Sequence, residues 1–309
     1  MNKLLFALVF IISFLPLRVL YAVSDVFYVL LINFFPYRKK VIERNLKSSF
    51  SELSIQELKR LRNQYYRHFS DLIVEGIKNL TISKKELNKR LVVENPEVLK
   101  DIIAKNKSVL LISGHYGNWE WMITSLAFLS PFKAIGIGMP LTNSFWNKSV
   151  NKRRSRFGLQ VVYSGNYKDA INEEGGPKAI LTLSDQSPGS SENAYWTTFL
   201  NQPTAVLFGA EFMAHEYQFT PVFFSIRKVK RGFYSLKLIP FEKPLIELNY
   251  GELTEWHTRL LEQEIEQNPN YWLWSHKRWK RQIPNDLNQL KSDQKKRFED
   301  RFRFKKQVH

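Results

Sequence analysis

The sequence predicts an α/β fold preceded by an apolar N-terminal segment, and three patterns lead to this prediction. Beyond residue 107, short apolar runs alternate with helical stretches, which is typical of a mainly parallel sheet with helices on both faces. The last two apolar runs flank the turn Lys230-Arg231-Gly232, as in an antiparallel hairpin. The first 35 residues are predominantly apolar and are followed at once by basic residues.

Strands are expected where apolar, β-branched or aromatic residues lie between turn residues. The expected strands are residues 108–113, 132–138, 160–163, 179–183, 220–227 and 233–241. Helices are expected where apolar residues recur at helical spacing, and the clearest begin at the capping boxes Ser54 to Glu57 and Ser83 to Glu86. The expected helices are residues 54–77, 83–91, 96–104, 118–129, 142–157, 167–174, 204–215, 253–265 and a last one that begins at Pro269.

The N-terminal segment is expected to be a membrane anchor that spans the bilayer or is embedded in it. Residues 4–17 and 19–35 are apolar stretches separated by Arg18, and Pro16 would kink a helix between them. A spanning helix needs about 20 apolar residues, so neither stretch is ideal alone. A cleaved secretory signal is one alternative, although residues 21–24 make a poor cleavage site. A buried pair of amphipathic helices is the other.

The charge of the chain restricts its partners. The formal net charge is +17, which favours nucleic acid, an acidic membrane surface or an acidic carrier protein. Basic residues directly after the apolar segment place the body on the cytoplasmic side of a membrane. The chain has no cysteine, so disulfides, thiolate catalysis and cysteine zinc sites are excluded. We divide the chain into an anchor (1–40), a body (41–285) and a charged tail (286–309) that is a solvated helix or a disordered arm.

One segment carries catalytic chemistry: Ser113-Gly114-His115-Tyr116-Gly117-Asn118-Trp119-Glu120-Trp121. His115 follows a predicted strand, at the sheet edge where open α/β folds bind ligands. His115 and Glu120 can meet if His115 lies in the loop and Glu120 in the first helical turn, with Asn118 as the N-cap. A neutral imidazole could then take the proton from a hydroxyl that attacks a thioester, while the carboxylate orients the ring.

Other interpretations of this segment stay open. Most His and Glu pairs at such a spacing are structural. A zinc site would need ligands from His215, His257 or His276, and these residues have no recognisable metal spacing.

Further residues are candidate substrate contacts. Arg153, Arg154 and Arg156 form a cluster that suits phosphate, because the planar guanidinium binds oxygens in pairs; a solvated helix face is the alternative. Asp185 follows another predicted strand and either shapes the site or stabilises a turn. Asn118 is a candidate contact as well. Residues 271–280 form either a core-packed helix or an interfacial helix with its tryptophans near lipid.

These motifs resemble those of the lipid A late acyltransferases, the lauroyl and myristoyl transferases of Gram-negative bacteria, in the lysophospholipid acyltransferase-like superfamily. His115 and Glu120 match the His-x4-Glu motif that follows a strand in that family. The resemblance extends from Leu15 to Lys280. Its other matching stretches are residues 36–40 with Asn45-Leu46, Asp185-Gln186 with Thr198-Phe199, and the C-terminal residues Pro269, Tyr271, Trp274, His276, Arg278 and Lys280.

The resemblance implies an αβα sandwich of the glycerolipid acyltransferase type. It implies transfer of a fatty acyl chain from acyl carrier protein to a hydroxyl of a lipid A precursor at the cytoplasmic face of the inner membrane. No metal, cofactor or covalent intermediate is implied. His115 would be the base and Glu120 its partner, with one of the three arginines nearby and Asp185 shaping the site.

Three alternatives stay open at this point. The acceptor could be another bacterial lipid, such as a lysophospholipid or an amino-acid-linked lipid, with the same chemistry. The charge could serve nucleic-acid binding, although no nucleic-acid-binding motif is present. The protein could also be a non-catalytic membrane scaffold.

Overall fold

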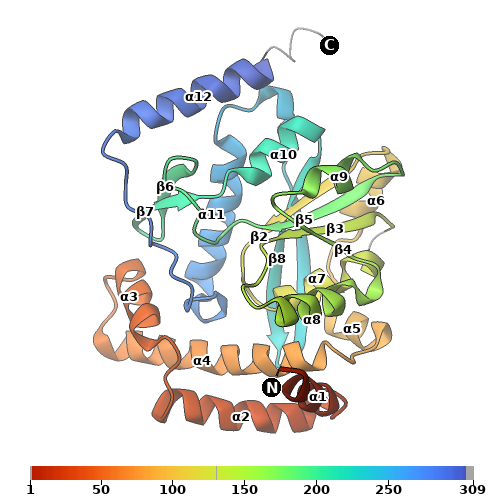
Figure 1. Cartoon of the computed structure of the whole chain (residues 1–309). Helices are drawn as coiled ribbons and strands as arrows, with labels where there is room; N and C mark the ends of the chain where they lie inside the picture. Colours follow the sequence, from red (N-terminus) through yellow and green to blue (C-terminus); the bar gives the residue numbers. More distant parts are fainter. Residues whose placement is uncertain (1, 130, 304–309) are drawn as a thin grey trace.

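The core is a seven-stranded sheet in the order β1-β9-β8-β2-β5-β3-β4 (Figure 1). The computed structural model describes residues 2–129 and 131–303. Neighbouring strands are parallel except β8 and β9, which form an antiparallel hairpin. The strands are β1 (Leu91–Val93), β2 (Val109–Ser113), β3 (Lys133–Gly138), β4 (Gln160–Tyr163), β5 (Lys178–Leu183), β8 (Thr220–Lys230) and β9 (Phe233–Pro240). A separate antiparallel pair consists of β6 (Tyr195–Phe199) and β7 (Gln202–Val206).

The six strands expected from the sequence are present, and the hairpin is antiparallel as predicted. Three short strands, β1, β6 and β7, were not predicted. The helix expected over residues 204–215 is wrong in its first part, because residues up to Val206 pair with β6 and the helix α10 (Gly209–Tyr217) begins only after them.

Helices cover both faces of the sheet, so the molecule is an αβα sandwich. All five side chains of β2 are buried. Val109 and Leu111 pack on the face covered by α4 (Ile55–Lys78), α5 (Lys84–Arg90), α6 (Glu97–Ala104) and α7 (Trp119–Leu129). Leu110 and Ile112 pack on the opposite face, with α9 (Tyr167–Asn172), α10 and α11 (Glu252–Gln267). The remaining helices are α3 (Lys39–Ser49), α8 (Ser144–Arg154), α12 (Leu287–Arg303) and the 3-10 turns η1 (Ser155–Phe157), η2 (Leu245–Glu247) and η3 (Pro269–Tyr271).

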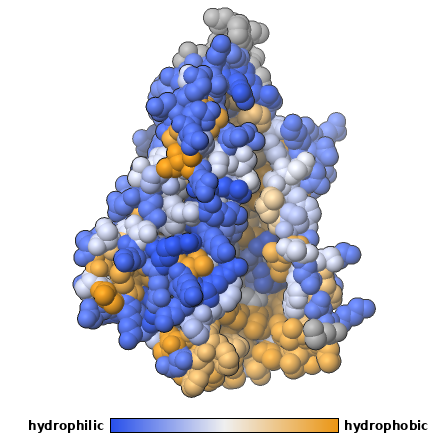
Figure 2. All heavy atoms as spheres, turned by 60° about the vertical axis from the view of Figure 1, so that its left-hand side comes forward, coloured by the Kyte–Doolittle hydropathy of each residue, from blue (hydrophilic) through white to orange (hydrophobic). Residues whose placement is uncertain are grey.

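The N-terminal apolar segment forms two helices, α1 (Asn2–Ile12) and α2 (Leu17–Asn33), and Pro16 directly precedes the second. α2 buries Leu17, Leu20 and Ser24 and leaves many apolar side chains exposed. These exposed residues form the apolar lower end of the molecule in Figure 2. Among the residues that the structure describes, no helix is both long enough and apolar enough to cross a bilayer. The expectation of a spanning anchor is therefore not confirmed.

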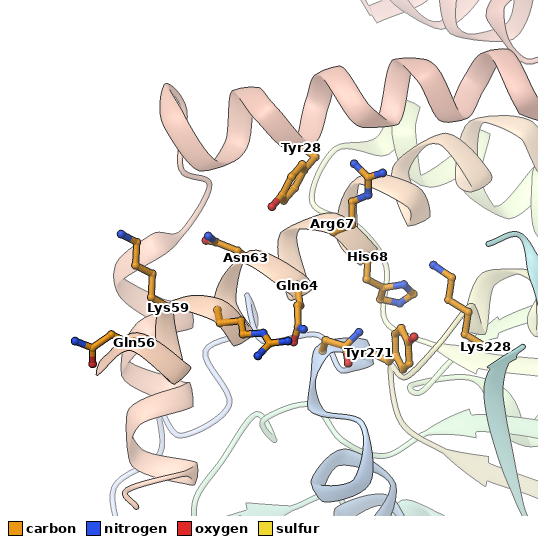
Figure 3. A pocket seen from close by; sticks show the side chains of 11 residues that line it. Tyr28, Gln56, Lys59, Asn63, Gln64, Arg67, His68, Lys228 and Tyr271 are labelled. Atoms are coloured by element: carbon orange, nitrogen blue, oxygen red, sulfur yellow. The ribbon is translucent and has the colours of Figure 1, made fainter. Parts of the chain in front are cut away.

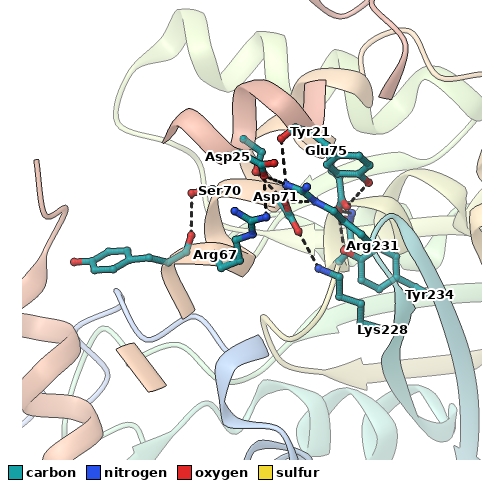
Figure 4. A network of polar contacts seen from close by, with 12 residues as sticks. Tyr21, Asp25, Arg67, Ser70, Asp71, Glu75, Lys228, Arg231 and Tyr234 are labelled. Carbon is teal, nitrogen blue, oxygen red and sulfur yellow. Dashed lines mark hydrogen bonds and ion pairs between the residues drawn. The ribbon is translucent and has the colours of Figure 1, made fainter. Parts of the chain in front are cut away.

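A partly buried polar network ties α2 to α4 and to the β8–β9 hairpin (Figure 4). Its centre is Asp71 of α4, which accepts a hydrogen bond from Ser24 at 2.8 Å and pairs with Lys228 at 3.0 Å and Arg231 at 2.7 Å. Arg231 also pairs with Asp25 of α2 at 2.5 Å. Asp25, the acidic residue within the apolar segment, thus lies against the body of the protein, where its charge is compensated.

The helix expected from Pro269 onwards is wrong. Only the 3-10 turn η3 forms, and the chain then runs without regular structure to residue 286. Trp272 and Trp274 are fully buried, so the interpretation as an interfacial helix is also wrong. The backbone is held by a distant side chain instead of helical bonds: the amide of Asn45 donates to the carbonyl oxygens of Trp274 at 2.9 Å and His276 at 2.8 Å. In the tail, residues 287–303 form α12, which is one of the two expected alternatives, and residues 304–309 lie outside the described part of the chain.

Candidate active site

His115 lies in the loop that follows β2, at the carboxyl edge of the sheet. β2 and β5 are parallel neighbours, and Ser113 is in register with Leu183. His115 and Asp185 each lie two residues beyond this matched pair, so the register brings them together. Gly114 permits the approach, because a Cβ at this position would lie 2.6 Å from a methyl carbon of Leu261 and 3.1 Å from the carboxyl carbon of Asp185.

The carboxylate that holds the ring of His115 belongs to Asp185. Nδ1 of His115 lies 2.6 Å from Oδ1 of Asp185, and the backbone N–H of His115 donates to Oδ2 at 2.8 Å. The indole N–H of Trp272 donates to the same Oδ2 at 2.8 Å. Burial raises the pKa of Asp185, but the ring and backbone N–H of His115 outweigh this and hold it at about 2. An ionised carboxylate on Nδ1 keeps the proton on that nitrogen and leaves the lone pair on Nε2.

The Nε2 side of the ring faces Gln186, whose amide nitrogen lies 3.3 Å away. With the proton on Nδ1, this amide donates to the Nε2 lone pair. The ring of Trp119 stands edge-on to the imidazole, with a distance of 5.2 Å between centroids. The side chain of His115 is 17% exposed and that of Asp185 only 3%, so the base is accessible and its partner is enclosed.

The expected contact between Glu120 and the ring of His115 is replaced by another pairing. Glu120 forms short ion pairs with Arg153 and Arg154 of α8, and Nε of Arg154 adds a bond at 3.2 Å. Burial raises the pKa of Glu120, but the two guanidinium groups and the nearby His115 lower it to about 2. The reason for the difference is geometric, since Glu120 is in the first turn of α7 and faces α8, whereas the register of β2 and β5 places Asp185 on the ring.

Two of the predicted substrate contacts, Asn118 and Arg156, form hydrogen bonds with other residues of the protein. Asn118 is 2% exposed; its side-chain oxygen caps α7 by accepting from the backbone N–H of Trp121 at 3.0 Å, and its side-chain NH2 donates to Glu75 at 2.6 Å. Arg156 donates to the carbonyl oxygens of Asn79 and Ile82 after the end of α4. Unpaired carbonyls at a helix end attract a cation, which explains this position.

Glu75 is a residue of this region that the sequence did not single out. It is fully buried on α4 and accepts hydrogen bonds from Tyr21 of α2, Tyr234 of β9 and Asn118 beside the His115 loop. Burial raises its pKa to about 7. Its helical spacing from Asp71 was visible in the sequence, but its three partners come from distant segments.

An apolar cleft of about 340 Å³ lies between α1, α4 and α8. Apolar side chains from all three helices line it, together with the charged pair Glu120 and Arg153. Phe6 belongs to α1, so the cleft reaches the apolar end of the molecule. In the described part of the chain, no three His, Asp or Glu side chains are grouped so that they could hold a metal ion.

The comparison with known families adds to this geometry. The sequence profile of the family described as "Bacterial lipid A biosynthesis acyltransferase" matches residues 2–281. The chain belongs to this family. No curated protein sequence matches it. Membership in the lipid A acyltransferase family makes the protein an acyltransferase that uses a lipid acceptor and an acyl donor.

Proposed function

We propose that this protein transfers a fatty acyl chain from acyl carrier protein to a hydroxyl of a lipid A precursor, with His115 as general base. The observation that carries the proposal is the 2.6 Å contact between Nδ1 of His115 and Asp185 in a chain of this family. It supports a neutral imidazole with its free lone pair on the accessible nitrogen.

In the proposed reaction, the acceptor hydroxyl takes the place of the Gln186 amide beside Nε2 of His115. Nε2 removes the hydroxyl proton as the oxygen attacks the thioester carbonyl, so the new C–O bond forms and a tetrahedral intermediate results. The C–S bond then breaks, and the leaving thiolate takes the proton from the imidazolium. Asp185 stabilises the imidazolium between the two steps. No bond to the enzyme is needed.

Glu120 and Arg153 have a different role in this proposal. Both line the apolar cleft, whose walls suit a fatty chain better than any polar ligand. Glu120 carries a negative charge close enough to His115 to interact with a positive charge on its ring, so we expect it to add to the stabilisation of the imidazolium. Arg153 is the arginine of the predicted cluster that we expect to be near the substrate.

We further propose that the apolar end formed by α1 and α2 is embedded in the cytoplasmic face of the inner membrane. Leu4, Phe14 and Phe35 are 79%, 64% and 72% exposed, which is unusual for large apolar side chains that gather on one face. Helices that bury an apolar face in the head-group region while keeping a polar face towards the protein bind membranes in this way. The +17 charge would attract an acidic carrier protein and anionic lipids to the same molecule.

The test is a transfer assay in detergent with purified protein, a tetra-acylated lipid A precursor and two donors, acyl carrier protein thioester and coenzyme A thioester. We expect transfer with the carrier-protein donor and a loss of at least about a hundredfold for His115→Ala. Unchanged activity of His115→Ala would refute the general-base assignment. Transfer to total membrane lipids but not to the precursor would favour a lysophospholipid or amino-acid-linked acceptor, and preference for coenzyme A would refute the proposed donor.

A further inference from the structure

Glu75 is a fully buried carboxylate of α4 that joins two distant parts of the molecule and has no part in the proposed reaction. Its Oε1 accepts a hydrogen bond from the hydroxyl of Tyr21 of α2 at 2.8 Å. Its Oε2 accepts one from the side-chain NH2 of Asn118 at 2.6 Å and another from the hydroxyl of Tyr234 of β9 at 2.8 Å. Figure 4 shows Glu75 with both tyrosines. One carboxylate thus connects α2 with the segment that follows His115.

The three donors explain why this residue is a carboxylate. An ionised carboxylate only accepts hydrogen bonds, so it can accept all three at once, whereas an amide would place a donor among them. Burying a carboxylate whose direct partners carry no charge is costly, and burial raises the pKa of Glu75 to about 7. An apolar side chain would fill the same space without this cost. The function of Glu75 is therefore to hold its three donors.

The bond from Asn118 reaches the surroundings of the catalytic base. Asn118 is the N-cap of α7, and the capped residue Trp121 also donates its indole N–H to the backbone carbonyl oxygen of Glu75 at 3.2 Å. The first residue of α7 is Trp119, whose ring stands edge-on to the imidazole of His115. A shift of the start of α7 would therefore move the ring of Trp119 relative to His115.

The bond from Tyr21 connects Glu75 to the apolar end of the molecule. On α2, the exposed apolar side chains near Tyr21 are Val19, Val23 and Val26. The guanidinium carbon of Arg231 lies 4.5 Å from the centroid of the Tyr21 ring, and any side chain at Gly232 would clash with the Tyr21 hydroxyl. The hydroxyl is therefore closely enclosed, and its bond to Glu75 depends on where α2 lies.

We infer that Glu75 is a positioning residue, which holds the start of α7 beside His115 in a position that depends on how α2 is seated. The His115 loop is held at one end by Asp185 and at the other, through Asn118, by Glu75. When α2 moves away from α4, Glu75 loses the bond from Tyr21 and holds the start of α7 less firmly. Contact of α2 with a bilayer thus affects the rate of transfer. The inference rests on the proposed function for this effect on the rate, but not for the effect on the loop.

The first test is hydrogen–deuterium exchange of the full-length protein in detergent, measured at the backbone amides of residues 114–121. We expect Tyr21→Phe to raise their exchange rates about fivefold, because Glu75 loses one of its hydrogen bonds. The matched control is Tyr28→Phe, which removes a hydroxyl from the same helix. Tyr28 lies beside the first half of α4, with its ring 5.2 Å from the guanidinium carbon of Arg67 (Figure 3). Unchanged exchange in Tyr21→Phe, or equal changes in both variants, would overturn the inference.

The second test is steady-state acyl transfer, with kcat and KM determined separately. We expect kcat to fall about fivefold for Tyr21→Phe and about fiftyfold for Glu75→Leu, which leaves the buried NH2 of Asn118 without an acceptor. KM should change by about twofold or less, since neither residue contacts substrate in the proposed reaction. Glu75→Gln should recover about tenfold of the loss in Glu75→Leu, because its side-chain oxygen can still accept from Asn118.

The double variant Tyr21→Phe with Glu75→Leu decides whether the two residues act together. Its kcat should equal that of Glu75→Leu, because Tyr21 acts through Glu75, whereas losses that multiply would overturn the inference. Thermal unfolding shows whether each variant is folded, and if Glu75→Leu is not, the exchange of Tyr21→Phe against Tyr28→Phe decides. A wild type without transfer activity would refute the proposed function, and the exchange measurement would still decide the inference.

Discussion

At the residue scale, the two carboxylates near His115 have different partners. Asp185 bonds the ring nitrogen and the backbone of His115 and is held in turn by Trp272. Glu120 lies between two guanidinium groups. Neutralising Asp185 should therefore affect mainly the rate of catalysis. Neutralising Glu120 should affect mainly the free energy of unfolding.

For Asp185→Asn we expect kcat to fall by about a hundredfold to ten-thousandfold, because the amide cannot hold the proton on Nδ1 as the carboxylate does. Steady-state transfer kinetics measure the change, and Asp286→Asn on the exposed surface is the control. If Asp185→Asn retained full activity while Glu120→Gln lost it, Glu120 would be the orienting carboxylate after all.

For Glu120→Gln we expect the free energy of unfolding to fall by about 2–3 kcal/mol, because two largely enclosed arginines lose their counter-ion. Adding Arg154→Gln should recover part of this loss, since one uncompensated charge is removed. Denaturant unfolding of the two single variants and the double variant gives the coupling. Strictly additive effects would show that the pairing contributes nothing to stability.

At the element scale, the segment after η3 positions the site although it has no regular structure. Trp272 within it contacts Asp185, and Asn45 of α3 holds the carbonyl oxygens on either side of Ser275. Arg38 donates to the carbonyl oxygen of Ser275 itself at 3.1 Å. Arg38 and Asn45, on either side of the boundary between the anchor and the body, thus fix the segment that encloses the carboxylate on His115.

Asn45→Ala should lower the free energy of unfolding by about 2 kcal/mol, because two buried carbonyl groups lose their donor. We also expect a severalfold lower kcat, as Trp272 is less firmly held against Asp185. Asn285→Ala, at an exposed position, is the matched control for both measurements. A stability loss without any change in kcat would mean that the segment does not position Asp185.

At the scale of the whole molecule, buried neutral histidines make stability depend on pH. Burial lowers the pKa of His68 and His257 to about 3 and that of His276 to about 4. The unfolded chain takes up protons near pH 6.5, whereas these folded residues do not. Their contribution to stability is therefore complete above about pH 6.5 and is lost as the pH falls towards 3.

His257→Gln should flatten this dependence. Each such histidine contributes at most about 1.4 kcal/mol per pH unit to the fall in the free energy of unfolding. We expect the slope between pH 6 and 4 to be smaller in the variant by up to this amount. Denaturant unfolding at several pH values gives the slopes. Parallel curves for the two proteins would show that His257 is protonated in the folded state.

Much of the local structure could be predicted from the sequence alone. Six of the seven strands of the sheet, the hairpin and the capped start of α4 follow from patterns within about twenty residues, where apolar spacing and caps decide the conformation. His115 and Asp185 were both predicted at the carboxyl ends of strands, and the motifs indicated the family that the profile match then showed. Asn118 caps α7 as its residue type predicted.

The tertiary structure alone decided which of these residues meet. His115 and Asp185 are 70 residues apart, and they touch because β2 and β5 are neighbours in register, which local sequence does not reveal. Glu120 was expected at His115 because it is close in sequence, yet its direction depends on where α8 packs. The segment after Pro269 was expected to be helical, but bonds from Asn45 and the burial of Trp272 and Trp274 outweigh local preference. Interactions between distant segments thus decide which side chains contact one another, while local interactions decide where most of the helices and strands form.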